Sequence, residues 1–157
     1  GFGCRVLAYD KYKTGFGNEF VTECDQETIF AETDILSLHV PLTAETRYLI
    51  NTDYLDRFQK NIWLINTSRG PVVNTAALVK ALESGKVAGA ALDVLEYEKT
   101  SFEAMDAEAF PEPLKQLVNF ENVILSPHIA GWTIESKYKL AKVLADKIRA
   151  WYLGYGI

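Results

Sequence analysis

Residues 61–74 read NIWLINTSRGPVVN, and this stretch decides the fold. The apolar run Ile62–Ile65 is short and unbroken, which predicts a strand covered on both faces in a parallel sheet. Polar and turn-forming residues follow at once, so the chain leaves the sheet with Arg69 at its carboxyl edge. Ligands bind at that edge of open α/β sheets, which makes Arg69 a candidate functional residue. The alternative is an arginine that caps a loop or pairs with a surface acid.

The composition is that of an ordinary globular domain. The 157 residues are enough for one domain with a real core and too few for two. Hydrophobic residues make up 48% and charged residues 24%, which argues against disorder. The net charge of -5 does not indicate the positively charged surface that binds nucleic acid. No apolar run is long enough to span a membrane. Cys4 and Cys24 lack metal-ligand spacing, so we expect no metal and a reducing, cytoplasmic setting.

Four other segments have the composition of short buried strands. Each of them ends at a polar residue or just before a turn, which stops the strand. In the third of these segments, glycine and alanine residues allow a helix or a ligand to approach closely. The segments are Arg5–Asp10, with Val6, Leu7, Ala8 and Tyr9 buried, Asp34–Leu38, Val87–Leu92, which holds the glycine and alanines, and Val123–Leu125.

Helical segments alternate with these strands. Asn74 is a good N-cap for a helix over Thr75–Ser84, and Gly85 suits the position after its end. Thr133 caps a closing helix at about 133–153, whose apolar residues share one stripe. Shorter helices are expected over Asp25–Glu32, Thr52–Phe58 and Leu114–Leu117. Strands that alternate with helices predict an α/β fold with a doubly wound, Rossmann-like parallel sheet.

Polar side chains stand at the ends of all five predicted strands. The carboxyl ends of parallel strands meet at one edge of the sheet, so we expect these side chains to lie along that edge. The chain has two histidines, and both fall among them. The residues are Asp10, His39, Arg69, Asp93 and His128.

Asp10 is a candidate for binding NAD. A carboxylate at the end of an early strand can accept hydrogen bonds from the adenosine ribose and repel the 2′-phosphate of NADP. The alternative is a solvated acid at a strand-to-loop junction. A glycine-rich phosphate loop is not found, and we expect it about twenty residues before Asp10, outside the chain. Because the chain starts at Gly1 without a methionine, we expect residues 1–157 to be a partial dinucleotide-binding domain, with a sheet incomplete at its N-terminal side.

His128 is the candidate acid/base, because an imidazole can both donate and accept a proton near neutral pH. Such a histidine works best beside a carboxylate that fixes its tautomer. Glu96 and Glu98 both follow the strand that ends at Asp93, so either could be that carboxylate. The alternative is a strand-end histidine that is hydrogen-bonded to a loop.

Four ordered motifs resemble those of the D-isomer-specific 2-hydroxyacid dehydrogenases. The similarity covers nearly the whole chain, which corresponds to the later part of that family's nucleotide-binding domain and its closing helix. The motifs are LHVPLT at 38–43, INTSRG at 65–70, GAALDV at 89–94 with Glu98 five positions after Asp93, and SPHIAG at 126–131.

The resemblance implies an NAD-dependent oxidoreductase that interconverts D-2-hydroxy acids and 2-keto acids. Arg69 would hold the substrate's carboxylate and carbonyl, His128 would be the general acid/base, and Glu98 rather than Glu96 would pair with it. The family also implies a separate substrate domain, absent from this chain, and a homodimer. The implied cofactor contacts are Asp10 at the adenosine ribose, Asp93 at the nicotinamide end, and His39, Val40, Pro41, Thr67 and Gly131.

Two features depart from the family pattern. Lys99 follows Glu98 at a position where the family commonly has proline, and the acidic segment Lys99–Pro113 is longer than usual. Trp132 follows Gly131, and we interpret it as part of a substrate wall or of a domain interface.

Two other functions are open at this point. One is a non-enzymatic NAD(H)-sensing protein similar to the carboxyl-terminal binding protein corepressors, which share the fold and an Arg, Glu and His set. The other is an α/β domain for a different nucleotide, in which the strand-end residues are structural. The intact HVPLT segment at 39–43 and the lack of basic stretches favour the enzyme.

Overall fold

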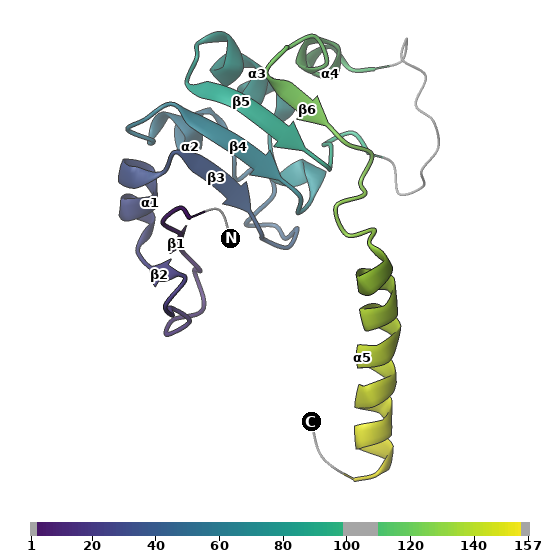
Figure 1. Ribbon diagram of the computed structural model, residues 1–157. Coiled ribbons are helices and arrows are strands. Elements are labelled where there is room, and N and C mark those ends of the chain that lie inside the picture. Colours follow the sequence, from purple (N-terminus) through teal and green to yellow (C-terminus); the bar gives the residue numbers. More distant parts are fainter. Residues whose placement is uncertain (1–2, 99–109, 155–157) are drawn as a thin grey trace.

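A four-stranded parallel sheet forms the centre of the molecule (Figure 1). The structure is a computed structural model, and it describes residues 3–98 and 110–154. All neighbouring strands are parallel, so their carboxyl ends lie at one edge, and the predicted parallel α/β sheet is confirmed. In order across the sheet, the strands are β3 (Ile35–Leu38), β4 (Ile62–Asn66), β5 (Val87–Leu92) and β6 (Val123–Leu125).

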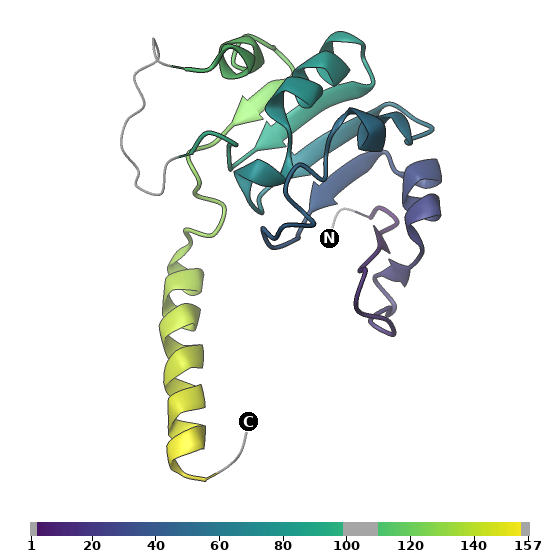
Figure 2. The ribbon, with the colours of Figure 1, turned by 180° about the vertical axis from the view of Figure 1, so that it is seen from behind.

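Three short helices connect the strands and cover one face of the sheet (Figure 2). Their fully buried side chains include Leu55, Leu78 and Leu117. These pack with strand residues such as Leu64 and Ala90, which neighbour each other in the register. The core therefore lies between the sheet and this helical layer. The helices are α2 (Thr52–Asp56), α3 (Thr75–Glu83) and α4 (Glu112–Leu117).

The opposite face of the sheet is open among the described residues (Figure 1). Ile35, Trp63 and Ile124 lie on it and are 61%, 50% and 69% exposed. The strand at Ile62–Ile65 is therefore covered on one face only, and β3 is an edge strand in which only Leu38 is buried. The prediction that Ile62–Ile65 is covered on both faces and the prediction that Asp34–Leu38 is a buried strand are wrong, because the three connecting helices all pack on the same side.

Gly89 in β5 makes room for a side chain from the neighbouring strand. A Cβ atom on Gly89 would lie 2.2 Å from the ring of Trp63, its partner in the register. The small residue in Val87–Leu92 thus accommodates a tryptophan from β4, where the sequence predicts the approach of a helix or a ligand.

The first part of the chain forms a separate two-stranded parallel sheet. β1 (Leu7–Ala8) pairs with β2 (Thr22–Glu23) and makes no ladder with β3. Val6 and Tyr9 are both 43% exposed. The prediction that Arg5–Asp10 is a buried strand of the main sheet is therefore wrong, because a two-residue strand beside one short partner has too little neighbouring surface to bury its flanks.

Local sequence signals place the helix ends. The side chains of Asp25, Asn74 and Thr133 each accept a hydrogen bond from a backbone N–H three residues further on, as N-caps do. Gly85 follows α3 with φ +76°, the left-handed conformation that glycine adopts without strain. The helix α1 (Gln26–Glu32) is fixed to the main core by a phenylalanine that packs edge-on against two aromatic rings. The helices predicted at these positions are confirmed.

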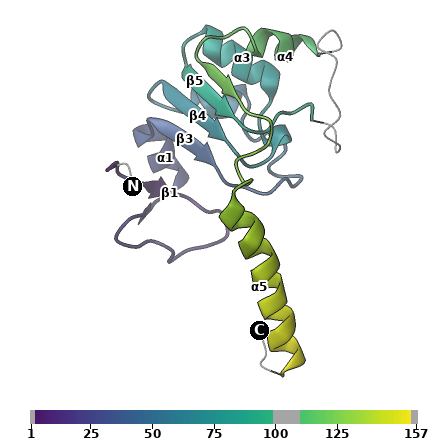
Figure 3. The same cartoon turned by 45° about the vertical axis from the view of Figure 1, so that its right-hand side comes forward.

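The last helix, α5 (Ile134–Tyr152), extends away from the sheet (Figure 3). It begins near the carboxyl edge, shortly after the segment that follows β6. Its apolar stripe, which includes Leu140, Leu144 and Ile148, is exposed. The helix predicted at 133–153 is thus confirmed, but within the described residues it does not close over the sheet. No helix in these ranges is both long and apolar enough to cross a membrane.

Candidate active site

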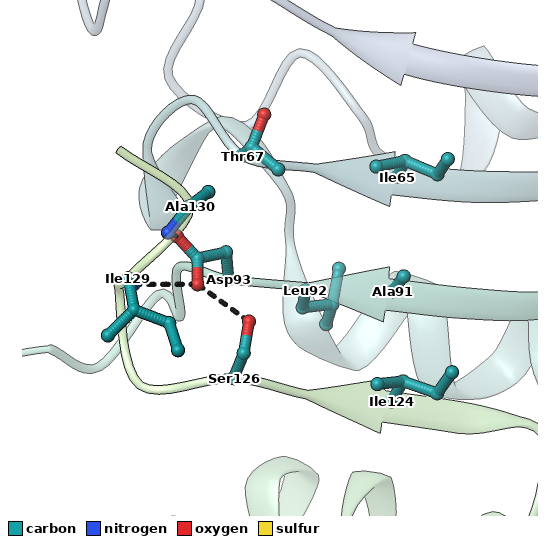
Figure 4. A pocket seen from close by; sticks show the side chains of 9 residues that line it. All are labelled: Ile65, Thr67, Ala91, Leu92, Asp93, Ile124, Ser126, Ile129 and Ala130. Atoms are coloured by element: carbon teal, nitrogen blue, oxygen red, sulfur yellow. Dashed lines mark hydrogen bonds between the residues drawn. The ribbon is translucent and has the colours of Figure 1, made fainter. Parts of the chain in front are cut away.

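A shallow pocket of about 350 Å³ lies at the carboxyl ends of β4, β5 and β6 (Figure 4). Three apolar side chains at neighbouring register positions form its floor on the open face of the sheet. A polar residue stands two positions further along each strand and forms the rim. Such a combination of an apolar surface and a few polar groups is typical of ligand sites. The lining residues are Ile65, Ala91 and Ile124 in the floor, Thr67, Asp93 and Ser126 in the rim, and Leu92, Ile129 and Ala130 beside them.

Asp93 organises the rim of this pocket. Its carboxylate accepts hydrogen bonds from the Ser126 hydroxyl at 2.6 Å and from the backbone N–H groups of Ile129 and Ala130, both at 2.8 Å (Figure 4). Burial opposes ionisation of this carboxyl group, but the hydrogen bonds outweigh burial and lower its pKa below the ordinary value. Asp93 is therefore a carboxylate at neutral pH, and it fixes the loop that holds His128.

His128 and Glu98 are in direct contact. The Nδ1 atom of His128 lies 3.1 Å from Oε2 of Glu98, although the two residues are 30 positions apart. His128 has φ +54°, a left-handed conformation that is uncommon outside glycine, and the bonds from Asp93 to the two following residues hold the loop in it. The His128 side chain is 41% exposed, so the pair stands at the surface of the carboxyl edge.

Glu98, and not Glu96, is the neighbour of His128. The Glu98 N–H donates to the Leu95 carbonyl, and the Glu98 carboxylate accepts from the Leu95 N–H, so this segment forms a tight turn. The carboxylate of Glu96 instead accepts from the backbone N–H of Thr75 at 2.8 Å. Of the two carboxylates, Glu98 is thus the one in contact with His128, as the family resemblance implies. Lys99 and most of the long acidic segment lie outside the described residues.

Arg69 stands on a loop whose backbone is fixed by a buried amide. Asn66, the last residue of β4, accepts from the N–H and hydroxyl of Ser68 and donates from Nδ2 to the Arg69 carbonyl. The guanidinium is exposed, and its Nη1 donates to the Ser68 carbonyl at 2.6 Å. The structure thus brings His128 and Glu98 together, and it leaves the Arg69 guanidinium at the same edge, bonded to its own loop.

Gly70 lets the Arg69 loop lie against the segment that carries Glu98. It begins a short 3-10 helix, η1 (Gly70–Val72), and a Cβ atom on it would lie 1.9 Å from the carbonyl oxygen of Leu95. The clashing atoms belong to the backbone, so they cannot move aside as the end of a side chain can. The two loops therefore approach as closely as a glycine permits.

We expect Gly70→Ala to destabilise the full-length protein by roughly 1–3 kcal/mol, because the added methyl group must push two backbone segments apart. Gly131→Ala is the matched control, since a Cβ atom there would meet nothing within 4 Å. Thermal unfolding of both variants beside the wild type measures the difference. Equal melting temperatures for the two variants would contradict the close approach of the loops.

Five of the candidate cofactor contacts follow strands of the main sheet and differ in their surroundings. Thr67 lines the pocket, and Gly131 follows the loop that closes it. His39 is exposed after β3, with its Nε2 atom 2.9 Å from the Ser37 hydroxyl. Val40 packs partly against the core, and the Pro41 carbonyl accepts a hydrogen bond from a nearby threonine hydroxyl at 2.6 Å. These residues follow β3, β4 and β6, so they are spread along one edge of the sheet.

Asp10 follows β1 and is outside the set of residues that line the pocket. Its Oδ1 atom accepts from the backbone N–H groups of Tyr12 and Lys13, which closes a local turn. The ammonium of Lys11, the next residue, is paired with Glu45 at 3.0 Å. A carboxylate therefore neutralises the positive charge that directly follows Asp10.

Sequence reasoning missed two residues that hold the site together. Asn66 fixes the Arg69 loop, and Ser126 bonds to Asp93 across neighbouring strands. A signal was present, because each is a small polar residue at a strand end within a motif that also carries a candidate. Their partners, however, become visible only once the strands are paired.

Comparison with known proteins identifies the family. Residues 1–130 match the family described as D-isomer specific 2-hydroxyacid dehydrogenase, NAD binding domain. A glyoxylate reductase of Thermofilum pendens is 43% identical over 154 residues, which cover 95% of this chain and 42% of the relative. A D-specific alpha-keto acid dehydrogenase of Enterococcus faecium is 43% identical over 136 residues, which cover 85% of this chain and 41% of that protein.

Solved structures give the same result. An NAD-complexed D-isomer specific 2-hydroxyacid dehydrogenase of Lactobacillus delbrueckii ssp. bulgaricus matches with a TM-score of 0.85 at 34% identity, over 99% of this chain and 47% of that one. A D-lactate dehydrogenase of Aquifex aeolicus, complexed with NAD and lactic acid, matches with a TM-score of 0.72 at 33% identity, over 98% and 48%. The chain therefore spans less than half the length of these relatives. Over that length it has their Rossmann-like fold, and it belongs to the NAD-binding domain family of the D-isomer specific 2-hydroxyacid dehydrogenases.

Proposed function

We propose that this chain is the cofactor-binding part of an NAD-dependent oxidoreductase that interconverts a D-2-hydroxy acid and its 2-keto acid. The observation that carries the proposal is the contact of 3.1 Å between His128 Nδ1 and Glu98 Oε2 at the carboxyl edge. A histidine oriented by a carboxylate is suited to proton transfer. The names of the matched relatives, among them a glyoxylate reductase and a D-lactate dehydrogenase, support the same class of reaction.

The pocket residues fit the nicotinamide end of NAD. The apolar floor suits a flat ring, and Thr67 and Asp93 on the rim suit its amide group. Asp93 has capacity for a further donor, because a carboxylate has about four acceptor positions and three hydrogen bonds reach it here. When bound, the cofactor supplies or takes up the hydride. Gly131, beside the loop that closes the pocket, would allow the cofactor to approach the backbone.

The rest of the cofactor is assigned to the earlier strand ends. His39, Val40 and Pro41 would lie along it, and Asp10 would accept hydrogen bonds from the adenosine ribose. Lys11 is paired with Glu45, which offsets one of the two positive charges that follow Asp10, and this supports NAD over NADP.

Arg69 is assigned to the substrate. Its planar set of N–H donors matches a carboxylate, and its charge would stabilise negative charge on the carbonyl oxygen during reduction. In that direction hydride adds to the carbonyl carbon, and the proton held by His128 moves to the carbonyl oxygen, which yields the hydroxyl group. Glu98 would keep the imidazole in the orientation needed for this transfer and balance its charge.

An assay of the full-length protein with NADH or NADPH and a panel of 2-keto acids tests the proposal. We expect oxidation of NADH by at least one of the acids, and slower oxidation of NADPH. Binding of NADH without turnover of any acid would contradict the enzyme and favour the non-enzymatic, corepressor-like alternative. Light scattering on the same preparation tests the homodimer that the family resemblance implies.

A further inference from the structure

The segment that carries Glu98 is tied to the start of α3. The Glu96 carboxylate accepts a hydrogen bond of 2.8 Å from the backbone N–H of Thr75, the first residue of that helix. Thr75 is buried and Glu96 is half-buried, so this hydrogen bond is partly shielded from water. The first N–H groups of a helix have no partner within the helix, and a carboxylate also suits the positive end of its dipole. Glu96 is therefore held firmly at this position.

Tyr48 lies close to Glu96. The Glu96 carboxylate raises the pKa of the Tyr48 hydroxyl, as expected for a hydroxyl next to a negative charge. Tyr48 itself has φ +54°, and its N–H donates to the carbonyl of Pro71, in η1, at 2.8 Å. Glu96, which is bonded to α3, thus lies beside a residue that is anchored on the loop following Arg69.

The backbone around Glu96 leaves little freedom for the residues on either side of it. A Cβ atom on Gly70 would lie 2.7 Å from the Glu96 nitrogen, so the backbones touch there. The turn from Leu95 to Glu98 is closed by hydrogen bonds at both of its ends. Only one residue separates Glu96 from Glu98, so a shift of the first is passed to the second.

We propose that Glu96 is a positioning residue for the acid/base pair, which anchors the Leu95–Glu98 turn on the start of α3 and so holds the Glu98 carboxylate against His128. The inference rests on the proposed function, because it assigns the contact between Glu98 and His128 to proton transfer. The Glu96 carboxylate is bonded to α3, so its influence on the reaction passes through Glu98.

Steady-state kinetics of the full-length protein, with NADH and a 2-keto acid that it accepts, tests this role. Glu96→Ala is expected to lower kcat on the order of 100-fold, the loss that a small misplacement of a catalytic group can cause, with the KM for NADH unchanged. Glu96→Gln should restore most of kcat, because the amide oxygen still accepts from Thr75. Glu121→Gln, at an exposed carboxylate on the loop before β6, is the control and should behave as the wild type.

A second variant removes the donor and leaves Glu96 in place. Thr75→Pro lacks the N–H group that bonds to Glu96, and proline is well tolerated at the first position of a helix. The preceding residue, Asn74, already has the extended ψ of 110° that proline requires. The same loss of kcat is expected. This variant tests the proposal even if Glu96→Ala fails to fold.

The Glu98→Gln background decides whether the effect passes through Glu98. In that background Glu96→Ala should change kcat by about twofold or less. A change of that size is within the error with which the effects of independent mutations add. An equal loss in both backgrounds, no rescue by Glu96→Gln, or a raised KM for NADH in place of a lowered kcat would overturn the positioning role alone. Normal turnover by a protein without the His128 imidazole would instead overturn the proposed function, and the positioning role with it.

Discussion

The His128→Asn variant of the full-length protein is expected to lose roughly 1000-fold in kcat while it binds NADH as the wild type does. General acid/base catalysis contributes about 10²–10⁴-fold, and an amide cannot supply the proton. The pocket proposed for the cofactor should be unaffected, because Asp93 holds the loop through the backbone N–H groups of Ile129 and Ala130, which the substitution does not alter. The expected change is therefore confined to turnover.

Asparagine is the appropriate replacement because of the backbone at this position. His128 has φ +54°, and asparagine tolerates the left-handed region better than most residues do. His128→Ala is the comparison: it should be as inactive as His128→Asn but should unfold at a lower temperature. Fluorescence titration measures the affinity for NADH, and single-turnover rates measure the chemical step. Near-normal turnover in the asparagine variant would remove His128 from proton transfer.

The sequence predicted the carboxyl edge of the sheet well. At β4, β5 and β6 an apolar run stops at a polar residue, and this pattern indicates where a chain leaves a sheet. The prediction for Val87–Leu92 matches β5 at both ends. Parallel pairing then brings the ends of β4, β5 and β6, with Arg69, Asp93 and His128, to one side of the molecule.

Burial was harder to predict, because an apolar run shows that a segment can be buried but not what covers it. Trp63 and Ile35 are large and apolar, as core residues are, yet they lie on the face that carries no helix among the described residues. The apolar stripe of α5 is exposed for the same reason. Whether a second layer covers such a surface depends on tertiary packing, which the local pattern does not contain.

The two glutamates could be told apart by the family resemblance but not by their chemistry. Glu96 and Glu98 are two residues apart and have the same chemistry, so reasoning from the residues alone left both open. The tight turn at Leu95 points them to different neighbours, Thr75 for the first and His128 for the second. Asp93, for which the sequence suggested only a cofactor contact, has a structural role as well, since it accepts three hydrogen bonds that hold the His128 loop.

The Arg69→Ala variant is expected to lose on the order of 1000-fold in kcat/KM for the 2-keto acid, with little change in NADH affinity. Removal of one donor to a developing oxyanion costs about 10²–10³-fold, and Arg69 is assigned to the substrate carboxylate in addition. The fold should tolerate the change. The guanidinium is exposed, and the bond from Asn66 goes to the Arg69 backbone carbonyl, which alanine retains.

Arg69→Lys separates charge from geometry at the same position. Lysine keeps the positive charge but lacks the planar set of donors that matches a carboxylate in two places, so it should recover only part of the lost kcat/KM. Titration with NADH, followed by steady-state assays over a range of keto-acid concentrations, distinguishes the two effects. If Arg69→Ala weakened NADH binding as much as substrate use, while the bound complex turned over normally, Arg69 would belong to the cofactor site and the substrate carboxylate would need another partner.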